Sequence, residues 1–228
     1  MPNAAEYRRL NTRKASALQV GGFRPSFRPS ASNFGMTALG LPGEAWPEHQ
    51  SKPMMFVCQL DLASAPARPP LLENLSLIVF FAGSLDDPLD REDGSNWVLR
   101  AYGSLEGLAP LAAPAGAPKV RKGFECLWQE LDDHPDSDDP ERVPVPGARH
   151  PSSNFDNVAR TKIGGYASLI QSELWWDLEN HPANPKFCLQ LNSEEKPGVV
   201  WPGGGTVYVA RGTAPGYENR WYLDYQCF

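Results

Sequence analysis

The feature that most constrains the fold of this chain is a short apolar motif that occurs twice. Residues 187–192 read Phe-Cys-Leu-Gln-Leu-Asn, and residues 56–61, which lie 131 positions earlier, read Phe-Val-Cys-Gln-Leu-Asp. An apolar run with a single Gln is typical of a buried strand whose one polar side chain needs a hydrogen-bond partner. Residues 32–35 and 161–164, which read Ser-Asn-Phe-Gly and Thr-Lys-Ile-Gly, are 129 positions apart and agree with this offset. The sequence therefore predicts a tandem duplication of one supersecondary unit.

The composition favours short strands over long helices. Gly (20 residues) and Pro (23 residues) are more abundant in the 228 residues than the roughly 12% of an average protein, which indicates many turns. A hydrophobic fraction of 41%, with seven Trp, seven Tyr and ten Phe, is enough for a packed core and excludes a disordered protein. The expected fold class is α+β and β-rich, with largely antiparallel sheets built from two tandem homologous halves and a few peripheral helices.

Changes in composition divide the chain into four segments that we expect to pack as one globular domain. Residues 1–31 form an N-terminal helix and a Pro-rich extended segment. Residues 32–131 form the first half, residues 132–160 an acidic, Pro-rich connector loop, and residues 161–228 the second half.

The N-terminal segment combines a helical pattern with a proline repeat. Apolar spacing predicts a helix from Asn3 to about Val20, which Gly21 and Gly22 would end. Residues 23–30 then repeat the tetrapeptide Phe-Arg-Pro-Ser, and a Pro in every fourth position excludes a helix there. We favour a linker that packs its two Phe side chains onto the body of the protein over a peptide-like ligand for another molecule.

Apolar runs predict most of the sheet. Leu75–Ala82 is apolar on both faces and is expected to be an internal strand. Residues 119–131 are compatible with either a strand or a short helix, and Ser168–Glu179 has the spacing of a helix. Further strands are predicted at Met54–Leu62, Trp97–Tyr102, Thr206–Arg211 and Trp221–Cys227.

Charge is concentrated in two places along the chain. The formal net charge is −6, and the stretch from Glu130 to Glu141 alone contains seven acids and no Lys or Arg. The first 28 residues carry six positive charges and one negative charge. A Pro-broken acidic stretch is a poor place for an acid–base pair, so it is either a solvated loop or a docking surface for a basic partner. The candidate partner-binding residues are Asp132, Asp133, Asp136, Asp138, Asp139 and Glu141.

Sequence motifs that would indicate an enzyme are missing. The chain contains no GxSxG, HExxH or GxxxxGK[ST] pattern, so we predict no catalytic residue and no cofactor. Three of the four His directly precede Pro, which suits exposed turns better than metal binding, and we predict no metal site. The four Cys are widely separated, which favours buried free thiols over zinc ligands or disulfides.

Gln59 and Gln190, the polar residues of the two motif copies, allow two interpretations. They could face a shared cleft between the halves, or each amide could bind loop backbone within its own half. We favour the second interpretation.

The sequence also allows a prediction of the cellular location of the protein. No apolar run approaches the roughly 20 residues of a membrane span, and the N-terminus lacks the apolar core of a secretory signal. We therefore expect a cytoplasmic protein that does not bind membranes. Direct binding of nucleic acid is not expected, because no basic and aromatic array accompanies a known module.

Several motifs occur in a characteristic order. They are Trp46-Pro47 and 56–61 in the first half, and Lys162 to Tyr166, 187–192, Trp201, Gly205 to Tyr208, Trp221, Asp224 and Cys227 in the second. This order resembles the YwqG-like family. The resemblance covers about residues 32–227 and implies a mixed, β-rich fold built by internal duplication. Two departures are Phe34-Gly35-Met36, where the family has a Gly-Gly turn, and Pro202-Gly203-Gly204, where an acid usually follows Trp201.

The resemblance implies a binding function rather than an enzymatic activity, since none is established for the family. Similar proteins occur as immunity proteins beside secreted bacterial toxins, including nuclease effectors of type VI secretion. Our leading hypothesis is a non-enzymatic immunity protein that binds a cognate, basic toxin domain and blocks its active site. The alternative is a small-molecule or glycan-binding module, with a cleft between the two halves lined by Trp and Gln.

Overall fold

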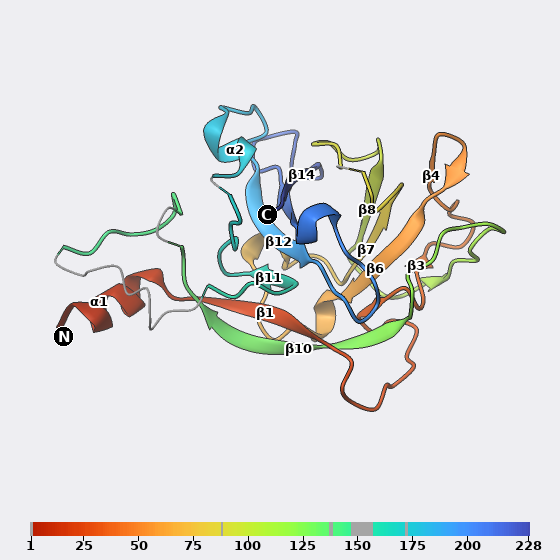
Figure 1. The fold of residues 1–228 in the computed structure, drawn as a ribbon, viewed down its shortest axis with the longest axis horizontal. Helices are drawn as coiled ribbons and strands as arrows, with labels where there is room; N and C mark the ends of the chain where they lie inside the picture. Colours follow the sequence, from red (N-terminus) through yellow and green to blue (C-terminus); the bar gives the residue numbers. More distant parts are fainter. Residues whose placement is uncertain (1, 88, 137–138, 147–156, 172) are drawn as a thin grey trace.

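A ten-stranded antiparallel sheet, curled almost into a barrel, organises the structure (Figure 1). The computed structural model describes residues 2–87, 89–136, 139–146, 157–171 and 173–228. The strands follow the order β14-β13-β12-β11-β1-β10-β2-β6-β7-β8, and all neighbours in this order pair antiparallel. The β-rich, largely antiparallel character expected from the sequence is therefore confirmed.

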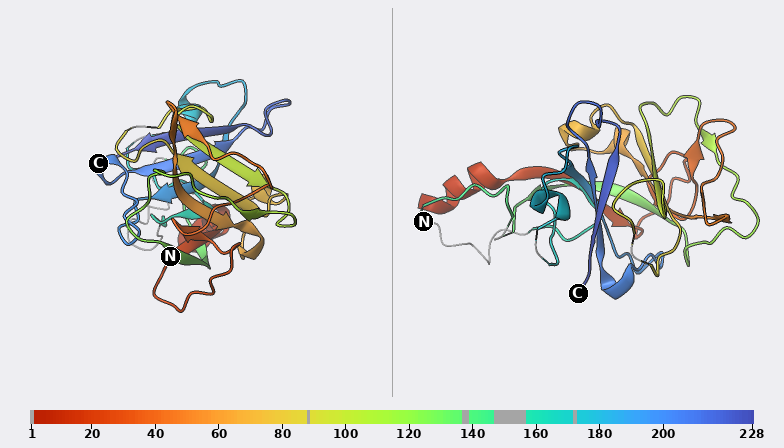
Figure 2. Two further views of the ribbon diagram at one scale, coloured as in Figure 1. Left: turned by 90° about the vertical axis from the view of Figure 1, so that its right-hand side faces the viewer. Right: turned by 90° about the horizontal axis from the view of Figure 1, so that it is seen from above.

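Two long strands occupy the middle of this sheet. β1 (Arg13–Val20) pairs with β10 (Phe124–Asp133) along its whole length, from Arg13 opposite Asp133 to Val20 opposite Cys126. The N-terminal helix α1 (Pro2–Asn11) precedes β1 and extends away from the sheet, as Figure 1 and the right-hand view of Figure 2 show.

A group of four strands lies on each side of the central pair. One group consists of β2 (Asn33–Phe34), β6 (Met55–Asp61), β7 (Leu77–Ala82) and β8 (Trp97–Tyr102). The other consists of β11 (Lys162–Gly164), β12 (Lys186–Asn192), β13 (Thr206–Arg211) and β14 (Trp221–Gln226). The shorter elements are β3 (Leu39–Gly40) with β9 (Ala109–Pro110), β4 (Glu48–His49) with β5 (Lys52–Pro53), α2 (Trp175–Leu178), and the 3-10 turns η1 (Leu62–Ser64), η2 (Pro70–Leu72) and η3 (Pro202–Gly204).

The two groups share detailed features at their motif strands. Each strand has a register shift at the start of the motif, between Phe56 and Cys58 in β6 and between Phe187 and Leu189 in β12. The hydroxyl of Ser32 accepts a hydrogen bond from the backbone N–H of Asp61 at 2.8 Å. The hydroxyl of Thr161 accepts the corresponding bond from Asn192 at 3.2 Å.

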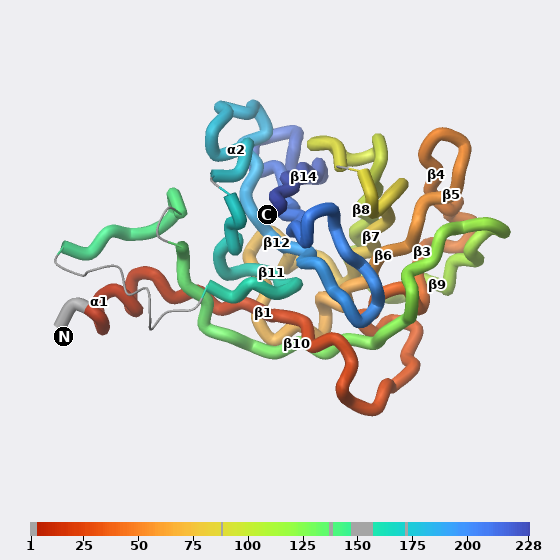
Figure 3. The backbone as a smooth tube through the Cα atoms, in the orientation of Figure 1, coloured from red at the N-terminus to blue at the C-terminus, as the bar shows by residue number. Residues whose placement is uncertain are grey.

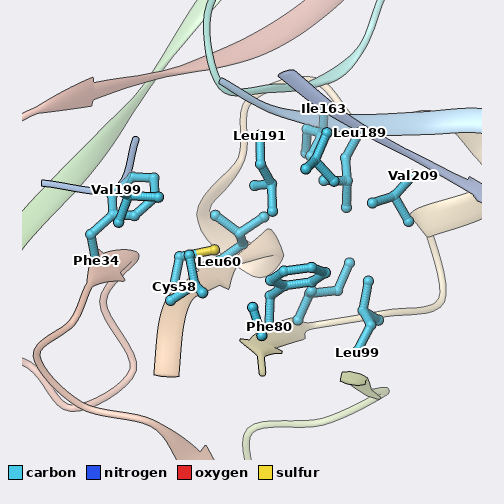
Figure 4. Close-up of a cluster of buried hydrophobic side chains, with 14 of the residues drawn as sticks. Phe34, Cys58, Leu60, Phe80, Leu99, Ile163, Leu189, Leu191, Val199 and Val209 are labelled. Carbon is cyan, nitrogen blue, oxygen red and sulfur yellow. The ribbon is translucent and has the colours of Figure 1, made fainter. Parts of the chain in front are cut away.

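The edges of the sheet approach each other where the curled sheet nearly closes. Glu92, in the loop before β8, forms an isolated bridge with Tyr222 of β14, and the N–H of Leu223 donates to the carbonyl of Arg91 at 2.9 Å. The same closure brings the side chains of both groups into one core (Figure 4). Phe80 of β7 packs edge-on against Trp201, which precedes β13, at a ring distance of 6.4 Å.

Most of the predicted strands are confirmed. β7 is buried at every position, as an internal strand requires, and β8 and β13 have the predicted ends. Residues 119–131, which were open between helix and strand, contribute most of β10. β10 extends beyond the predicted half by two residues, so Asp132 and Asp133 belong to a strand and not to the connector loop.

The two predicted helices are largely wrong. The first ends at Asn11, and the following residues form β1 because β10 and β11 offer backbone partners on both sides. The second is limited to Trp175–Leu178. The backbone N–H groups of Ser168, Ile170 and Gln171 instead donate to the side-chain oxygens of Gln190 and Gln226, which holds this stretch against the sheet.

Within the described residues there is no helix with the length and hydrophobicity to cross a membrane.

Candidate protein-docking site

The predicted acidic residues divide into a group on the sheet and a group beyond it. Asp132 and Asp133 are the last two residues of β10. Asp136, Asp139 and Glu141 follow in the segment that leaves the sheet, and Asp138 lies outside the described residues. Asp132 is exposed and forms an ion pair with Lys14 at 2.8 Å, and the hydrogen bond from Lys14 holds the pKa of Asp132 below its usual value.

Asp133 has an internal role and cannot contact a partner. Its side chain is fully buried and forms an ion pair of 2.7 Å with Lys162, which is fully buried as well. The same carboxylate accepts hydrogen bonds from the backbone N–H groups of Tyr166 at 2.9 Å and Val158 at 2.8 Å. The prediction that Asp133 is a partner-binding residue is therefore wrong, because its strand position turns the side chain into the junction of β10 and β11.

The environment of Lys162 resembles a Ser–Lys pair but is closed to substrate. Lys162 Nζ lies 3.1 Å from Ser168 Oγ, which donates a hydrogen bond to the carbonyl of Val158 at 2.8 Å. Burial lowers the pKa of Lys162, and the neighbouring Asp133 carboxylate opposes this shift. A nucleophile must reach a reacting carbon, and Ser168 is 7% exposed. We interpret this cluster as a buried structural network.

The outer acidic residues are tied to α1. Asn11, at the end of α1, donates through its amide to the carbonyl of Val143 at 3.0 Å and accepts from the N–H of Val143 at 2.8 Å. Glu141 forms an ion pair with Arg13 at the start of β1. Tyr7 is buried, and burial raises its pKa, with Arg142 and Asp139 acting on it from the acidic segment.

We call α1 together with the described residues of 134–146 the projecting arm. The two segments run side by side and extend beyond the sheet on one side of the molecule (Figures 1 and 3). Most of the described side chains of α1 are exposed, and Tyr7 and Asn11 are its buried residues. A helix with so little apolar surface depends on its neighbours for stability, and here the acidic segment is that neighbour.

A hollow lies at the base of the projecting arm, and we call it the arm hollow. Aromatic and aliphatic side chains of the second strand group form its walls, namely Tyr166, Leu169, Leu174, Trp176 and Phe187. Charged side chains complete its lining, namely Asp139 and Glu141 from the arm and Asp177 and Lys186 from the sheet side. Asp139 is only 9% exposed, whereas the other three are exposed. The volume of the arm hollow is about 30 Å³, which is room for one water molecule and not for a side chain of a partner. A partner would therefore contact the arm and the exposed charged side chains around the hollow.

Two carboxyls of the arm hollow titrate near neutral pH. Burial raises the pKa of Asp139 to about 6, while its hydrogen bond from the N–H of Glu141 opposes the shift. Burial also raises the pKa of Asp177 to about 6, while Lys186 opposes the shift. The charge of these two carboxyls therefore depends on pH near 6.

A second hollow lies where the two strand groups meet. Asp93, Leu99 and Ala101 line it from one group and Arg211, Asn219 and Trp221 from the other. The guanidinium of Arg211 donates to the carbonyls of Leu71 and Glu218 and to the side chain of Asn74, so its hydrogen bonds are used within the chain. Trp221 is buried, with the guanidinium 5.6 Å from its ring.

The Gln residues of the motif strands bind backbone groups, as predicted. Gln59 accepts from the N–H of Leu39 at 2.9 Å and donates to the carbonyls of Pro29 and Ala31. Gln190 accepts from the N–H of Ser168 at 2.9 Å and donates to the carbonyl of Arg160 at 2.9 Å and to the side chain of Asn192. Neither amide faces a shared cleft.

The predictions for the Cys and His residues are only partly confirmed. Cys58, Cys126 and Cys188 are buried free thiols, as expected, and Cys227 is partly exposed. His134, which was expected in an exposed turn, is buried and hydrogen-bonded to Thr12 at 3.0 Å. Among the residues with described positions, no group of three or more His, Cys, Asp or Glu side chains is arranged to hold a metal ion.

Three residues of the candidate docking site could not be predicted from the sequence. Trp176, Asp177 and Phe187 come from a predicted helix and a predicted core strand, and only the fold brings them beside Asp139. Lys162 could have been recognised from the sequence as a residue that needs a partner. A lone Lys in an apolar strand before a Gly-Gly turn requires a carboxylate, because burial of its unpaired charge would destabilise the fold. Its partner, 29 positions earlier, could not be chosen among seven neighbouring acids.

Scans against known protein families and against curated proteins find no match to this chain. The resemblance to the YwqG-like family therefore remains a prediction.

Proposed function

We propose that this chain is a cytoplasmic, non-enzymatic immunity protein that binds a secreted bacterial toxin, of the nuclease type delivered by type VI secretion, and blocks its active site. The observation that carries the proposal is the projecting arm. A charged arm held clear of the sheet by dedicated hydrogen bonds is a construction suited to another protein.

The distribution of charge changes how such binding would work. Asp132, Asp133 and Glu141 already neutralise Lys14, Lys162 and Arg13 within the chain. A continuous acidic surface that imitates nucleic-acid phosphates is therefore weaker than the sequence suggests. We assign the affinity mainly to direct contacts of the toxin with the projecting arm, and we assign faster encounter and orientation to the arm's charges.

The first experiment tests whether the chain neutralises the toxin. The chain is expressed in a bacterial host together with the toxin candidate encoded by the adjoining reading frame, and growth is followed with and without the chain. Binding of the purified pair is measured by calorimetry. Rescue of growth and formation of a stable complex are expected, and toxicity that persists together with the absence of a complex would refute the proposal.

A second experiment locates the interface. The variant Asp136→Asn, Asp139→Asn, Glu141→Gln removes three arm charges and leaves the buried Asp133 in place. The variant Asp86→Asn, Asp87→Asn is the matched control, because these exposed acids lie in the loop between β7 and β8. The arm variant should bind the toxin candidate at least about tenfold more weakly and with a smaller salt dependence, whereas the control should bind normally.

We further propose that the fold arose by tandem duplication. Support comes from the mirrored strand order of the two groups, the register shift at the same point of each motif strand, and the equivalent bonds of Gln59 and Gln190. In this arrangement β1 and β10 lie between the repeats rather than within them.

The second candidate function is binding of a small polar molecule or glycan at the hollow where the two strand groups meet. The location matches a cleft between halves, and residues of both groups line it. Its Trp face is covered by Arg211, however, so a sugar ring has no free aromatic surface to stack on. Thermal shift against a panel of sugars and nucleotides tests it, because a ligand raises the melting temperature by mass action.

A further inference from the structure

The Phe-Arg-Pro-Ser repeat forms a loop between β1 and β2 that projects from the sheet (Figures 1 and 3). Phe23 is half-buried, but Phe27 is 72% exposed. The expectation that both Phe pack onto the body is therefore wrong for Phe27. Phe27 also has a φ of 57°, in the left-handed region that a bulky residue rarely adopts. Residues in such strained conformations are concentrated at active sites, ligand-binding segments and switch regions, so Phe27 is a candidate binding residue.

A buried carboxylate holds this loop in position. Glu125 of β10 accepts hydrogen bonds from the N–H of Ser26 at 2.9 Å, from the hydroxyl of Ser26 at 2.7 Å and from the N–H of Phe27 at 2.9 Å. Burial alone would raise the pKa of Glu125, but these hydrogen bonds outweigh burial and lower the pKa, so the carboxylate is charged. The loop is therefore preorganised, and little of its conformational entropy is lost when a partner binds.

A hollow of about 220 Å³, which we call the Phe27 hollow, lies against this loop. Three Gly, Pro25 and Met36 line it together with Phe23 and Phe27 from the loop and Phe124 and Glu125 from β10. A cavity of roughly 150 Å³ can accommodate a benzene ring, so the Phe27 hollow has room for one aliphatic or aromatic side chain. Unlike the arm hollow, it can therefore receive an anchor side chain of a partner.

Exposed cations lie around the Phe27 hollow. Arg24 lies between two residues that line it, and Arg28 is close enough to the Glu125 carboxylate to help lower its pKa. Lys122 Nζ lies 5.3 Å from the centre of the Phe124 ring. Glu125 is the only acid among the described lining residues, and its oxygens already accept hydrogen bonds from the loop. The surroundings of the hollow are therefore basic, while the hollow itself is mainly apolar.

We propose that the Phe27 hollow binds an acidic segment of another protein, with one aliphatic or aromatic side chain in the hollow and carboxylates on Arg24, Arg28 and Lys122. Charge complementarity selects this class of partner, because the cations around the hollow attract acids and the hollow accepts an apolar anchor. The proposal does not depend on the proposed function, since the toxin assigned to the projecting arm is basic. The loop and the arm also adjoin opposite ends of the pair formed by β1 and β10, so the two surfaces lie apart.

A protein segment accounts for these features better than a lipid surface or a nucleic acid. Aromatic residues, Met and Arg are the side chains enriched at protein interfaces, and this surface combines all three. A membrane is contacted by apolar side chains that enter it, which leaves a concave hollow without a function. Single-stranded nucleic acid requires a groove that continues along several nucleotides, whereas the Phe27 hollow is a single site.

Selection from a library of random short peptides displayed on phage, with the full chain as the immobilised target, tests the proposal. The enriched peptides are expected to carry acids on both sides of one Leu, Ile, Met or Phe. The most strongly enriched peptide is then synthesised with a fluorophore, and fluorescence anisotropy measures its dissociation constant. Replacement of its apolar anchor by Ala, or of its acids by amides, should weaken binding at least about tenfold, and salt should weaken binding of the original peptide.

The variant Phe27→Asn tests whether the peptide occupies the Phe27 hollow. Asn tolerates a positive φ, so this substitution removes the aromatic ring and leaves the backbone of the loop unstrained. It should weaken peptide binding at least about tenfold. Phe228→Asn is the matched control, because it removes a Phe side chain that is 91% exposed at the other end of the chain, and it should bind the peptide normally.

The double variant Arg24→Ser, Arg28→Ser tests the role of the cations. It should also weaken peptide binding at least about tenfold and should reduce the salt dependence. Lys52→Ser, Arg220→Ser is the matched control, because it removes two exposed cations from β5 and from the loop between β13 and β14. Circular dichroism and melting temperatures check that all variants are folded, and the two loop variants test the site independently of each other.

Several outcomes would overturn the proposal. They are a selection that enriches no acidic peptide, and peptide binding that neither loop variant weakens. Binding to vesicles of anionic phospholipid or to oligothymidylate that is tighter than binding to the peptide, and that Phe27→Asn abolishes, would replace the protein segment by a membrane or by single-stranded nucleic acid. Self-association of the wild type that Phe27→Asn abolishes, measured by sedimentation velocity, would replace it by a second copy of the chain.

Discussion

Lys162 and Asp133 concentrate the polar interactions of the region where β10 meets β11. Both side chains are fully buried, and their ion pair is supported by the N–H groups of Val158 and Tyr166 and by the hydroxyl of Ser168. The two buried charges compensate each other, and removal of one residue leaves the charge of the other buried without a partner. The junction therefore depends on both residues together.

Replacement of Lys162 by Met should destabilise the protein strongly. Unfolding in urea is expected to show a loss of about 3–5 kcal/mol, because the Asp133 carboxylate would be left buried without its cation. Lys14→Met is the matched control, since Lys14 forms exposed ion pairs with Glu130 and Asp132, and it should cost less than about 1 kcal/mol. Equal losses of unfolding free energy in the two variants would show that the buried ion pair contributes no more to stability than the exposed pairs.

Gly165 offers an independent test of the same cluster. Its φ is +67°, and a Cβ atom there would lie 2.1 Å from Asp133 Oδ2, so a side chain would displace the carboxylate. Gly165→Ala should lower the free energy of unfolding by roughly 2 kcal/mol or more. Gly216→Ala has a similar φ of +87° with open space around it, and its loss should be limited to the backbone strain of about 1–2 kcal/mol.

At the scale of the elements, the two motif strands make the same use of their Gln residues. Each amide accepts from one backbone N–H group and donates to a loop carbonyl, which ties the loop that precedes the strand to the sheet. Gln59→Leu and Gln190→Leu should each cost about 1–3 kcal/mol, because they leave buried backbone groups without partners. Urea unfolding measures both, with the exposed Gln129→Leu as control. A loss at only one of the two positions would contradict the equivalence of the strand groups.

The elements that could be predicted from the sequence are those whose pattern is local. β7 is an unbroken apolar run, and the copies of the motif locate β6 and β12 because the repeat fixes both. β1 was missed since its Ala and Leu spacing also fits a helix, and only the backbone partners supplied by β10, more than a hundred positions away, decide for a strand. The arm hollow was missed for the same reason, because its lining residues come from separate stretches of the chain.

At the scale of the molecule, the uneven distribution of charge gives the protein two different ends. The projecting arm carries the acids of 134–146, and the exposed Arg24 and Arg28 lie in the Phe-Arg-Pro-Ser loop that follows β1 at the other end of the central strand pair.

The pH dependence of stability tests the electrostatics of the arm hollow. The pKa of Asp139 and that of Asp177 are raised by burial to about 6, above the ordinary value of 3.8 that an unfolded chain shows. The folded state therefore binds more protons than the unfolded state between these values, and the contribution of both groups to stability falls as pH rises from about 4 to beyond 6.

In the double variant Asp139→Asn, Asp177→Asn this fall in stability should disappear, so the melting temperature should decline less with pH than in the wild type. Asp132→Asn is the control of opposite sign, because Lys14 lowers the pKa of Asp132 and its contribution is lost only as pH falls below the ordinary value. A double variant whose melting curve follows the wild type across this range would show that neither carboxyl is held in the hollow as described.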